Sequence, residues 1–101
     1  MLLAPNPNQD QAGDTAPSGG MYIRQHTLTA GDDSITVDFS DLGLTTAPTL
    51  VEGGSIAKSA AGQSNLYASY VDDTKTTTAA TFELNAPCDV TGRTLTYMLR
   101  L

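Results

Sequence analysis

The chain has 101 residues, the length of a single domain. It has few large side chains with which to form a core, with no Trp, two Phe and four Tyr. It carries a net charge of −6, from eleven acidic and five basic residues, and no stretch concentrates the basic residues. This distribution argues against nucleic acid or an anionic membrane as a partner, and no stretch reaches the apolar length of a membrane span. Small cores of this kind are commonly stabilised by oligomerisation, so we expect partner subunits.

The first twenty residues differ in composition from the rest of the chain. After Met1, Leu2 and Leu3 the segment consists of Pro, Gly, Asn, Gln, Asp and other small residues, with no hydrophobic period. Such a segment buries too little apolar surface to offset the entropy lost on ordering. We therefore expect residues 1–20 to form an extended N-terminal arm and residues 21–101 to form a β-sandwich domain. At about 3.3 Å per residue, an extended arm of this length reaches about 60 Å.

Runs of strand-forming residues alternate with turn signals after residue 20. In the second run, Ile35, Val37 and Phe39 alternate with polar residues, a pattern typical of a strand that is buried on one face. In the third run, Gly53 and Gly54 predict a bulge or a kink. Six strands are expected, at residues 21–29, 34–39, 49–56, 65–71, 78–86 and 94–101.

The regular spacing of these short strands, with no convincing helical period, is typical of an antiparallel sandwich or barrel. We therefore predict an all-β fold, an antiparallel six-stranded β-sandwich with an extended N-terminal arm. The last strand carries an apolar stripe up to the terminal residue, which predicts a paired and packed strand rather than a frayed end. In 57–64 a short helix stays open as an alternative to a loop, although Gly62 weakens it.

Candidate catalytic groups are sparse in this sequence. His26 is the only histidine, and it lies in a strand pattern with no readable nucleophile beside it. One Cys and one His do not make a zinc site, and Cys88 is expected to be a small, half-buried residue without a disulfide partner. We therefore expect no enzymatic activity, no metal and no cofactor.

Two acidic pairs leave an alternative open. Asp32 with Asp33 and Asp72 with Asp73 place carboxylates in turns, and carboxylate oxygens are ligands for calcium. Asp is also a common turn residue because its side chain bonds the local backbone, and neither pair has the spacing of an EF-hand. Turn formation is the favoured interpretation, and a cation site is the alternative.

The tyrosines are the best candidates for contact with a partner. Tyr67 and Tyr70 lie on opposite faces of one expected strand, so one of them points outward unless both faces are covered. An outward Tyr can serve a subunit interface or stack on a sugar ring, and for a small oligomerising domain we favour the interface. The candidate subunit-interface or ligand-contact residues are His26, Tyr67, Tyr70 and Tyr97.

The order of segments resembles two groups of small β proteins. The stretches "ITVDFSDLGLTTAPTLVEGGSI", "NLYASYVDDTKTTTAATFELNAP" and "GRTLTYMLRL" are similar to the layout of small virion proteins of tailed bacteriophages and to that of the H-type lectins. The resemblance implies a six-stranded antiparallel sandwich that assembles as a homotrimer. The lectin binding surface usually includes a Trp, which this chain lacks. The resemblance therefore supports trimeric assembly more strongly than carbohydrate binding. The matching residues are Phe39, Ala47, Pro48, Thr49, Thr76 to Ala80, Phe82, Leu84 and Tyr97.

The N-terminal arm resembles that of small head-decoration, or cement, proteins of tailed phages. This resemblance implies a structural virion protein, assembled in the host cytoplasm, whose arm clamps the major capsid protein and stabilises the head. The alternative is a receptor- or glycan-binding module of a head or tail fibre. Leu2 and Leu3 are the expected apolar plug, and the prolines limit strand addition by the arm. The expected capsid-anchoring residues are Met1, Leu2, Leu3, Pro5, Pro7 and Pro17.

Overall fold

The computed structural model describes residues 20–101, so the expected arm lies outside the described residues apart from Gly20. The all-β, antiparallel class is confirmed, and the described part of the chain contains only one short helix, the 3-10 helix η2 (Ser40–Leu42). None of its helices has the length and apolar character needed to cross a membrane. The strands are β1 (Met21–Thr27), β2 (Ser34–Asp38), β3 (Leu50–Glu52), β4 (Ile56–Ala57), β5 (Ala68–Tyr70), β6 (Ala79–Leu84) and β7 (Thr94–Arg100).

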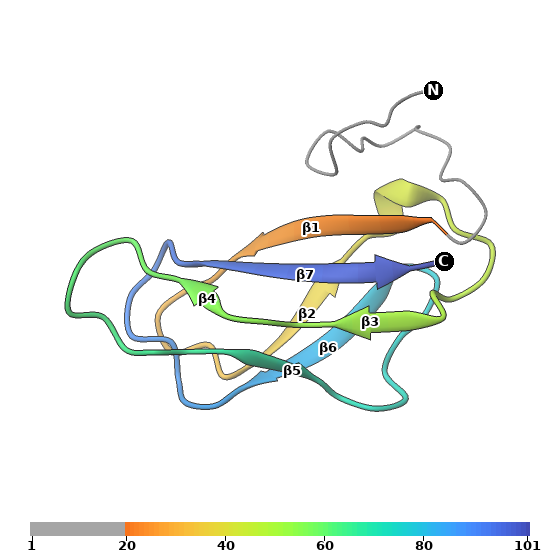
Figure 1. Ribbon diagram of the computed structural model, residues 1–101. Helices are drawn as coiled ribbons and strands as arrows, with labels where there is room; N and C mark the ends of the chain where they lie inside the picture. The colour runs from red at the N-terminus through yellow and green to blue at the C-terminus, as the bar shows by residue number, and fades with distance from the viewer. Residues whose placement is uncertain (1–19) are drawn as a thin grey trace, which may run out of the picture.

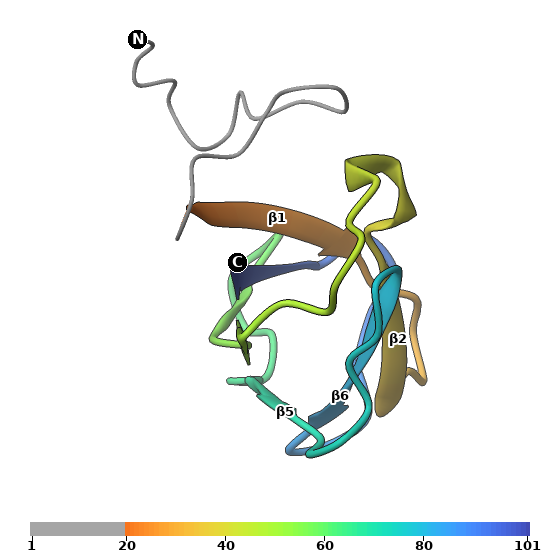
Figure 2. The same ribbon diagram turned by 90° about the vertical axis from the view of Figure 1, so that its right-hand side faces the viewer.

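The strands form two antiparallel sheets (Figure 1). In the first sheet, β7 lies between β1 and β3, and β4 also pairs with β7. In the second sheet, β6 lies between β2 and β5. Figure 2 shows β2, β5 and β6 grouped on one side of the molecule, with β1 and the C-terminus on the other. Strands β1 and β2, which follow each other in the chain, are therefore edge strands of different sheets.

The expected third strand is divided in two at its glycine pair, which is why the structure has seven strands instead of six. Glu52 pairs with Met98 and Ile56 pairs with Leu95, so three residues of this segment stand opposite two residues of β7. This count is that of a β-bulge, as the Gly-Gly pair predicted. The bulge turns the segment toward the second sheet, where the Ala68 N–H donates to the carbonyl of Gly54 at 2.9 Å.

The core lies between the inner faces of the two sheets. The alternation expected for the second run is confirmed, because Ile35, Val37 and Phe39 are all buried. Phe82 stacks at a tilt on Tyr97, with their ring centroids 5.7 Å apart, and so joins the two sheets. The remaining buried apolar side chains are Tyr22, Leu28, Val51, Ile56, Leu66, Ala68, Ala80, Leu84, Cys88, Leu95 and Leu99.

Both ends of the described chain lie at the same end of the first sheet, on the neighbouring strands β1 and β7. The N–H of Leu101 donates to the carbonyl of Gly20 at 2.9 Å, and Gly20 is buried. The expectation that the last strand is paired and packed is therefore confirmed. It also follows that Gly20 is held in a fixed position beside the C-terminus.

In the segment 57–64, which could have been a short helix, Ala57 ends β4 and the remaining residues form a loop with a turn. The Gln63 side chain closes this loop, because its Oε1 accepts from the Ser59 N–H and its Nε2 donates to the Ser59 hydroxyl, both at 2.9 Å. A side chain that bonds the backbone four residues earlier replaces the hydrogen bonds that a helix would have made.

Candidate functional site

Tyr67 and Tyr70 lie on opposite faces of their segment, as expected. Tyr67 points outward with 54% of its surface exposed. Tyr70 points inward and packs edge-to-face on Phe82, at 6.2 Å between ring centroids. The hydroxyl of Tyr70 accepts hydrogen bonds from the backbone N–H groups of Thr74 and Lys75, at 3.2 and 3.0 Å. Tyr67 is thus free to contact a partner, whereas Tyr70 holds a turn.

The other two candidate contact residues lie on the first sheet. Tyr97 is 3% exposed, and its position in the core removes it from the set of candidate contact residues. Burial raises the pKa of its phenol, and the nearby Arg24 acts in the opposite direction. Arg24 is bound by Asp41 of η2 in an ion pair of 2.6 Å. His26 is half-buried on β1, and its backbone pairs with that of Leu95.

Both acidic pairs form turns, which is the interpretation that the sequence favoured. The carboxylate of Asp32 accepts from the Thr29 N–H at 2.8 Å, and its own N–H returns to the carbonyl of Thr29. Asp73 adopts a positive φ of 67°, a conformation that Asp tolerates in turns. Asp72 and Asp73 line a recess of about 390 Å³ together with Tyr70 and Lys75. Nowhere in residues 20–101 do three or more metal-ligating side chains come together.

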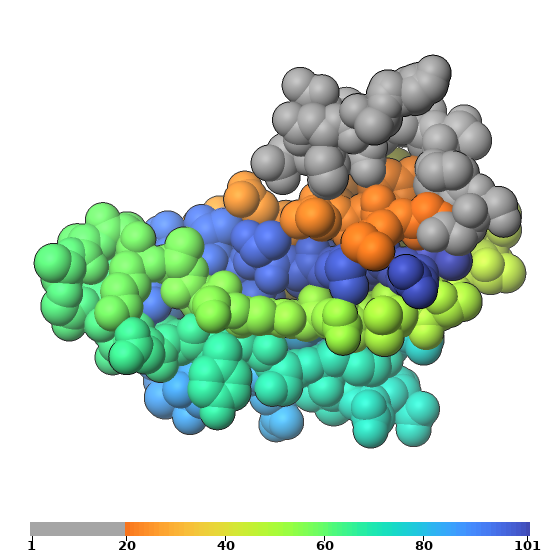
Figure 3. Space-filling view, in the orientation of Figure 1, coloured from red at the N-terminus to blue at the C-terminus, as the bar shows by residue number. Residues whose placement is uncertain are grey.

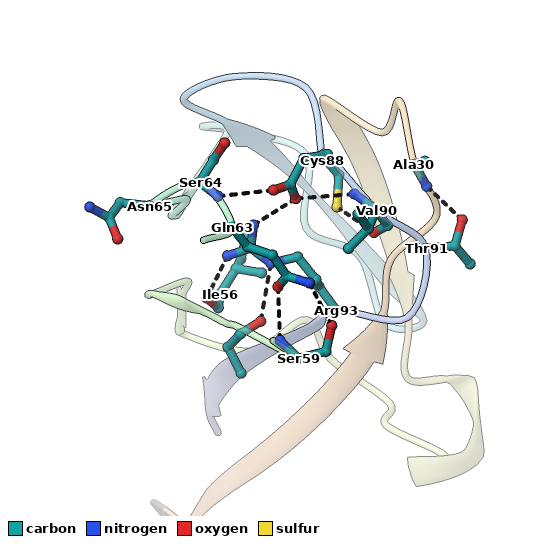
Figure 4. Close-up of polar contacts among 12 residues, drawn as sticks. Ala30, Ile56, Ser59, Gln63, Ser64, Asn65, Cys88, Val90, Thr91 and Arg93 are labelled. Carbon is teal, nitrogen blue, oxygen red and sulfur yellow. Dashed lines mark hydrogen bonds and ion pairs between the residues drawn. The ribbon is translucent and has the colours of Figure 1, made fainter. Parts of the chain in front are cut away.

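A polar cluster surrounds Arg93, a residue that no sequence motif singles out. Its side chain is completely buried just before β7 (Figure 4). Nη1 donates to Asp89 at 2.7 Å, while Nε and Nη2 donate to the carbonyls of Ala57 and Ile56, both at 3.2 Å. Asp89 accepts the N–H of Ser64 with its second oxygen, at 2.9 Å.

This cluster stabilises structure and is not arranged for chemistry on a ligand. The hydrogen bond from Ser64, followed by that from Arg93, lowers the pKa of Asp89 to about 2. All three nitrogens of the Arg93 guanidinium group are engaged inside the protein, so the buried cation binds strand β4 and the loop before β7 together. One sequence feature pointed to this pair, namely an acid and a base four residues apart in a turn region. That spacing is too common to identify a buried ion pair.

The outer faces of the two sheets differ in chemistry. Register places Met21, Arg100 and Leu50 in one row across the outer face of the first sheet. The next row holds Ile23, Met98 and Glu52. Figure 3 shows this face toward the viewer, with β1 in orange, β7 in blue and β3 in yellow-green. We call these six residues the outer apolar face. The outer face of the second sheet is formed instead by Ser34, Thr36, Asp38, Ser69, Ala79, Thr81 and Glu83.

Strand β1 also presents an open hydrogen-bonding edge. The bonds from Leu101 N–H to Gly20 and from Leu28 N–H to Arg93 flank the β1–β7 pair. Residues of an antiparallel strand alternate in the direction of their backbone groups, so the even-numbered residues of β1 bond to β7. The backbone N–H and C=O groups that point away from β7 are those of Met21, Ile23, Gln25 and Thr27.

The expected capsid-anchoring residues, Met1 to Pro17, lie outside the described residues. Comparisons with known proteins gave no match to a family model, to a curated protein or to a solved structure. The case for a function therefore depends on the surfaces described above.

Proposed function

We propose that this chain is a structural, non-enzymatic virion protein that decorates the head of a tailed phage as a homotrimer. In this proposal residues 21–101 are the body, and residues 1–20 are an arm that clamps the major capsid protein. The observation that carries the proposal is the fixed position of Gly20, the last residue of the expected arm. The buried Gly20 is bonded to Leu101, beside the exposed Met21 and Leu50.

Because Gly20 is held in place, a pull on the arm is transmitted to the body. Tension on the arm is passed through the Gly20 carbonyl into the pairing of β1 with β7, which is the longest strand pair described. Binding to the assembled shell and not to its dissociated subunits stabilises the shell by mass action. Three arms on one trimer add avidity, since each bound arm raises the effective concentration of the others.

The test is the binding of the protein to shells assembled from the major capsid protein of the phage that encodes it. The full chain is expected to co-sediment with shells, and a variant that lacks residues 2–19 is expected to stay in the supernatant. Replacement of Leu2 and Leu3 by Asp should weaken binding, because these are the proposed apolar plug. Replacement of Gln9 and Gln11 by Asp adds the same charge and is the matched control. Equal binding by the truncated and full proteins would overturn the arm clamp.

A second function, glycan or receptor binding by a head or tail fibre, is supported by Tyr67. Its exposed ring lies where the bulged segment meets the second sheet, since Tyr67 forms a bridge with Ser55. An exposed Tyr can stack on a sugar ring. Saturable binding on a glycan array that Tyr67→Ala abolishes, with no shell binding by the full chain, would favour this function over decoration.

A further inference from the structure

We infer that the outer apolar face of β1, β7 and β3 is the surface through which this chain binds a second copy of itself. The inference goes beyond the proposed function, because two copies of one face meet about a twofold axis and this contact is therefore distinct from the threefold contacts of the proposed homotrimer. The face combines exposed apolar side chains with one cation and one anion, and each of these features has a counterpart on the same face of another copy.

The apolar part of the face distinguishes it from the rest of the surface. Met21 and Leu50 are 41% and 38% exposed, and Tyr67 is the one other large apolar side chain of residues 20–101 with comparable exposure. Ile23 and Met98 are partly exposed in the next row of the same face. The outer face of the second sheet carries mainly hydroxyl and carboxylate groups instead. A sheet face that packs on nothing usually has the second pattern, so the first indicates a contact surface.

The charged part of the face makes it complementary to itself. Arg24 and Arg93 are each paired with an Asp of their own chain. Arg100 and Glu52, in contrast, have no ion-pair partner within residues 20–101. They lie on neighbouring strands in adjacent rows, with Leu50 and Met98 at the other two corners of the square.

This arrangement fits a second copy better than an unrelated apolar partner. When two such faces meet, Arg100 of one copy can reach Glu52 of the next while the Met and Leu side chains cover one another. Partner copies then neutralise both charges as the apolar surface leaves water. A partner with a purely apolar surface would leave both charges buried and unpaired, which is costly.

Charge reversal tests the inference in the full chain. Arg100→Glu makes the face doubly acidic, and Glu52→Arg makes it doubly basic. We expect each variant alone to self-associate at least tenfold more weakly than the wild type in sedimentation velocity, because like charges then meet. An equimolar mixture of the two variants should recover association, since an acidic face meets a basic one. Lys58→Glu and Glu83→Arg make the same reversals at exposed positions away from the face and should associate like the wild type.

Other outcomes would overturn the inference. A full chain that is monomeric at micromolar concentration, or variants that associate like the wild type, would exclude this face as a self-association surface. If Leu2→Asp with Leu3→Asp abolishes association and the charge reversals do not, the N-terminal segment is the occupant of the contact instead. Shell binding is measured separately, so a protein that coats shells without self-associating would refute this inference and leave the arm clamp standing.

Discussion

Arg93 and Asp89 form an ion pair of 2.7 Å in which the guanidinium is wholly buried and the carboxylate side chain keeps 26% of its exposure. The pair joins three parts of the chain, because Arg93 also bonds strand β4 and Asp89 also bonds the loop residue Ser64. Strand β4 is only two residues long, so these side-chain bonds supplement a short ladder. The end of the first sheet therefore depends on a single buried cation.

Arg93→Met is expected to destabilise the protein by about 3 kcal/mol. Met keeps much of the buried volume but leaves the carbonyls of Ile56 and Ala57 without their donors, and each unsatisfied buried acceptor costs about 1 to 3 kcal/mol. Arg24→Met is the control, because it removes a partly exposed ion pair in the middle of β1 and should cost about 1 kcal/mol or less. Urea unfolding measures both values, and equal losses would contradict the assigned role of Arg93.

Acid should weaken the protein through Asp89. Its pKa is lowered from 3.8 to about 2 by the hydrogen bond from Ser64 and then by Arg93. A group whose pKa is lower in the folded state contributes stability above its unfolded value and loses that contribution as the pH falls through its folded value. The urea midpoint should therefore decline between pH values of about 4 and about 2, and Asp89→Asn should flatten that decline. Asp72→Asn, at an exposed turn, should leave it unchanged.

The two glycines of the bulge should respond differently to substitution. A Cβ on Gly53 would overlap the backbone carbonyl oxygen of Ala68 and lie 2.9 Å from Cδ2 of Phe82. Gly53→Ala is thus expected to cost at least about 2 kcal/mol, since backbone and core must both shift. A Cβ on Gly54 would meet its nearest neighbour, the carbonyl oxygen of Thr96, at 3.9 Å. Gly54→Ala should therefore be tolerated, and thermal unfolding that ranks the two variants in reverse would contradict the bulge geometry.

Proline can locate the open edge of β1. The N–H of Gln25 points away from β7 and that of His26 points toward it, from the alternation set by the flanking hydrogen bonds. Gln25→Pro removes an unpaired donor, a position at which edge strands accept proline. His26→Pro removes a ladder bond and should be about 2 kcal/mol more destabilising. Equal stability of the two variants in urea would show that the edge has been assigned to the wrong residues.

Much of the body could be predicted from the sequence, because one-sided burial leaves a period of two. The alternation of Ala80, Phe82 and Leu84 in β6 and of Leu95, Tyr97 and Leu99 in β7 marked the residues that are buried. The glycine pair indicated the bulge for another local reason, because Gly alone lets another backbone approach closely. These features are local, so a reading of neighbouring residues is sufficient to find them.

The surfaces could not be predicted, because they depend on register between distant strands. Nothing near Arg100 in the sequence reveals that it lies between Met21 and Leu50. The burial of Arg93 likewise depends on carbonyls of β4 that precede it by more than thirty residues. Tyr97 alternates with Leu95 and Leu99, so its place among the candidate contact residues conflicted with the pattern of its own strand, and the structure buries it.

The most direct test of the proposed decoration is an image of the protein on its shell. Under the proposal a tailed phage encodes this chain, so cryo-electron microscopy of shells of that phage, incubated with the full-length protein, would supply it. The account predicts threefold density at regular positions on the outside of the shell, with an extended segment leading from each body onto the major capsid protein. Shells that carry no added density, or protein found only on a fibre, would contradict it.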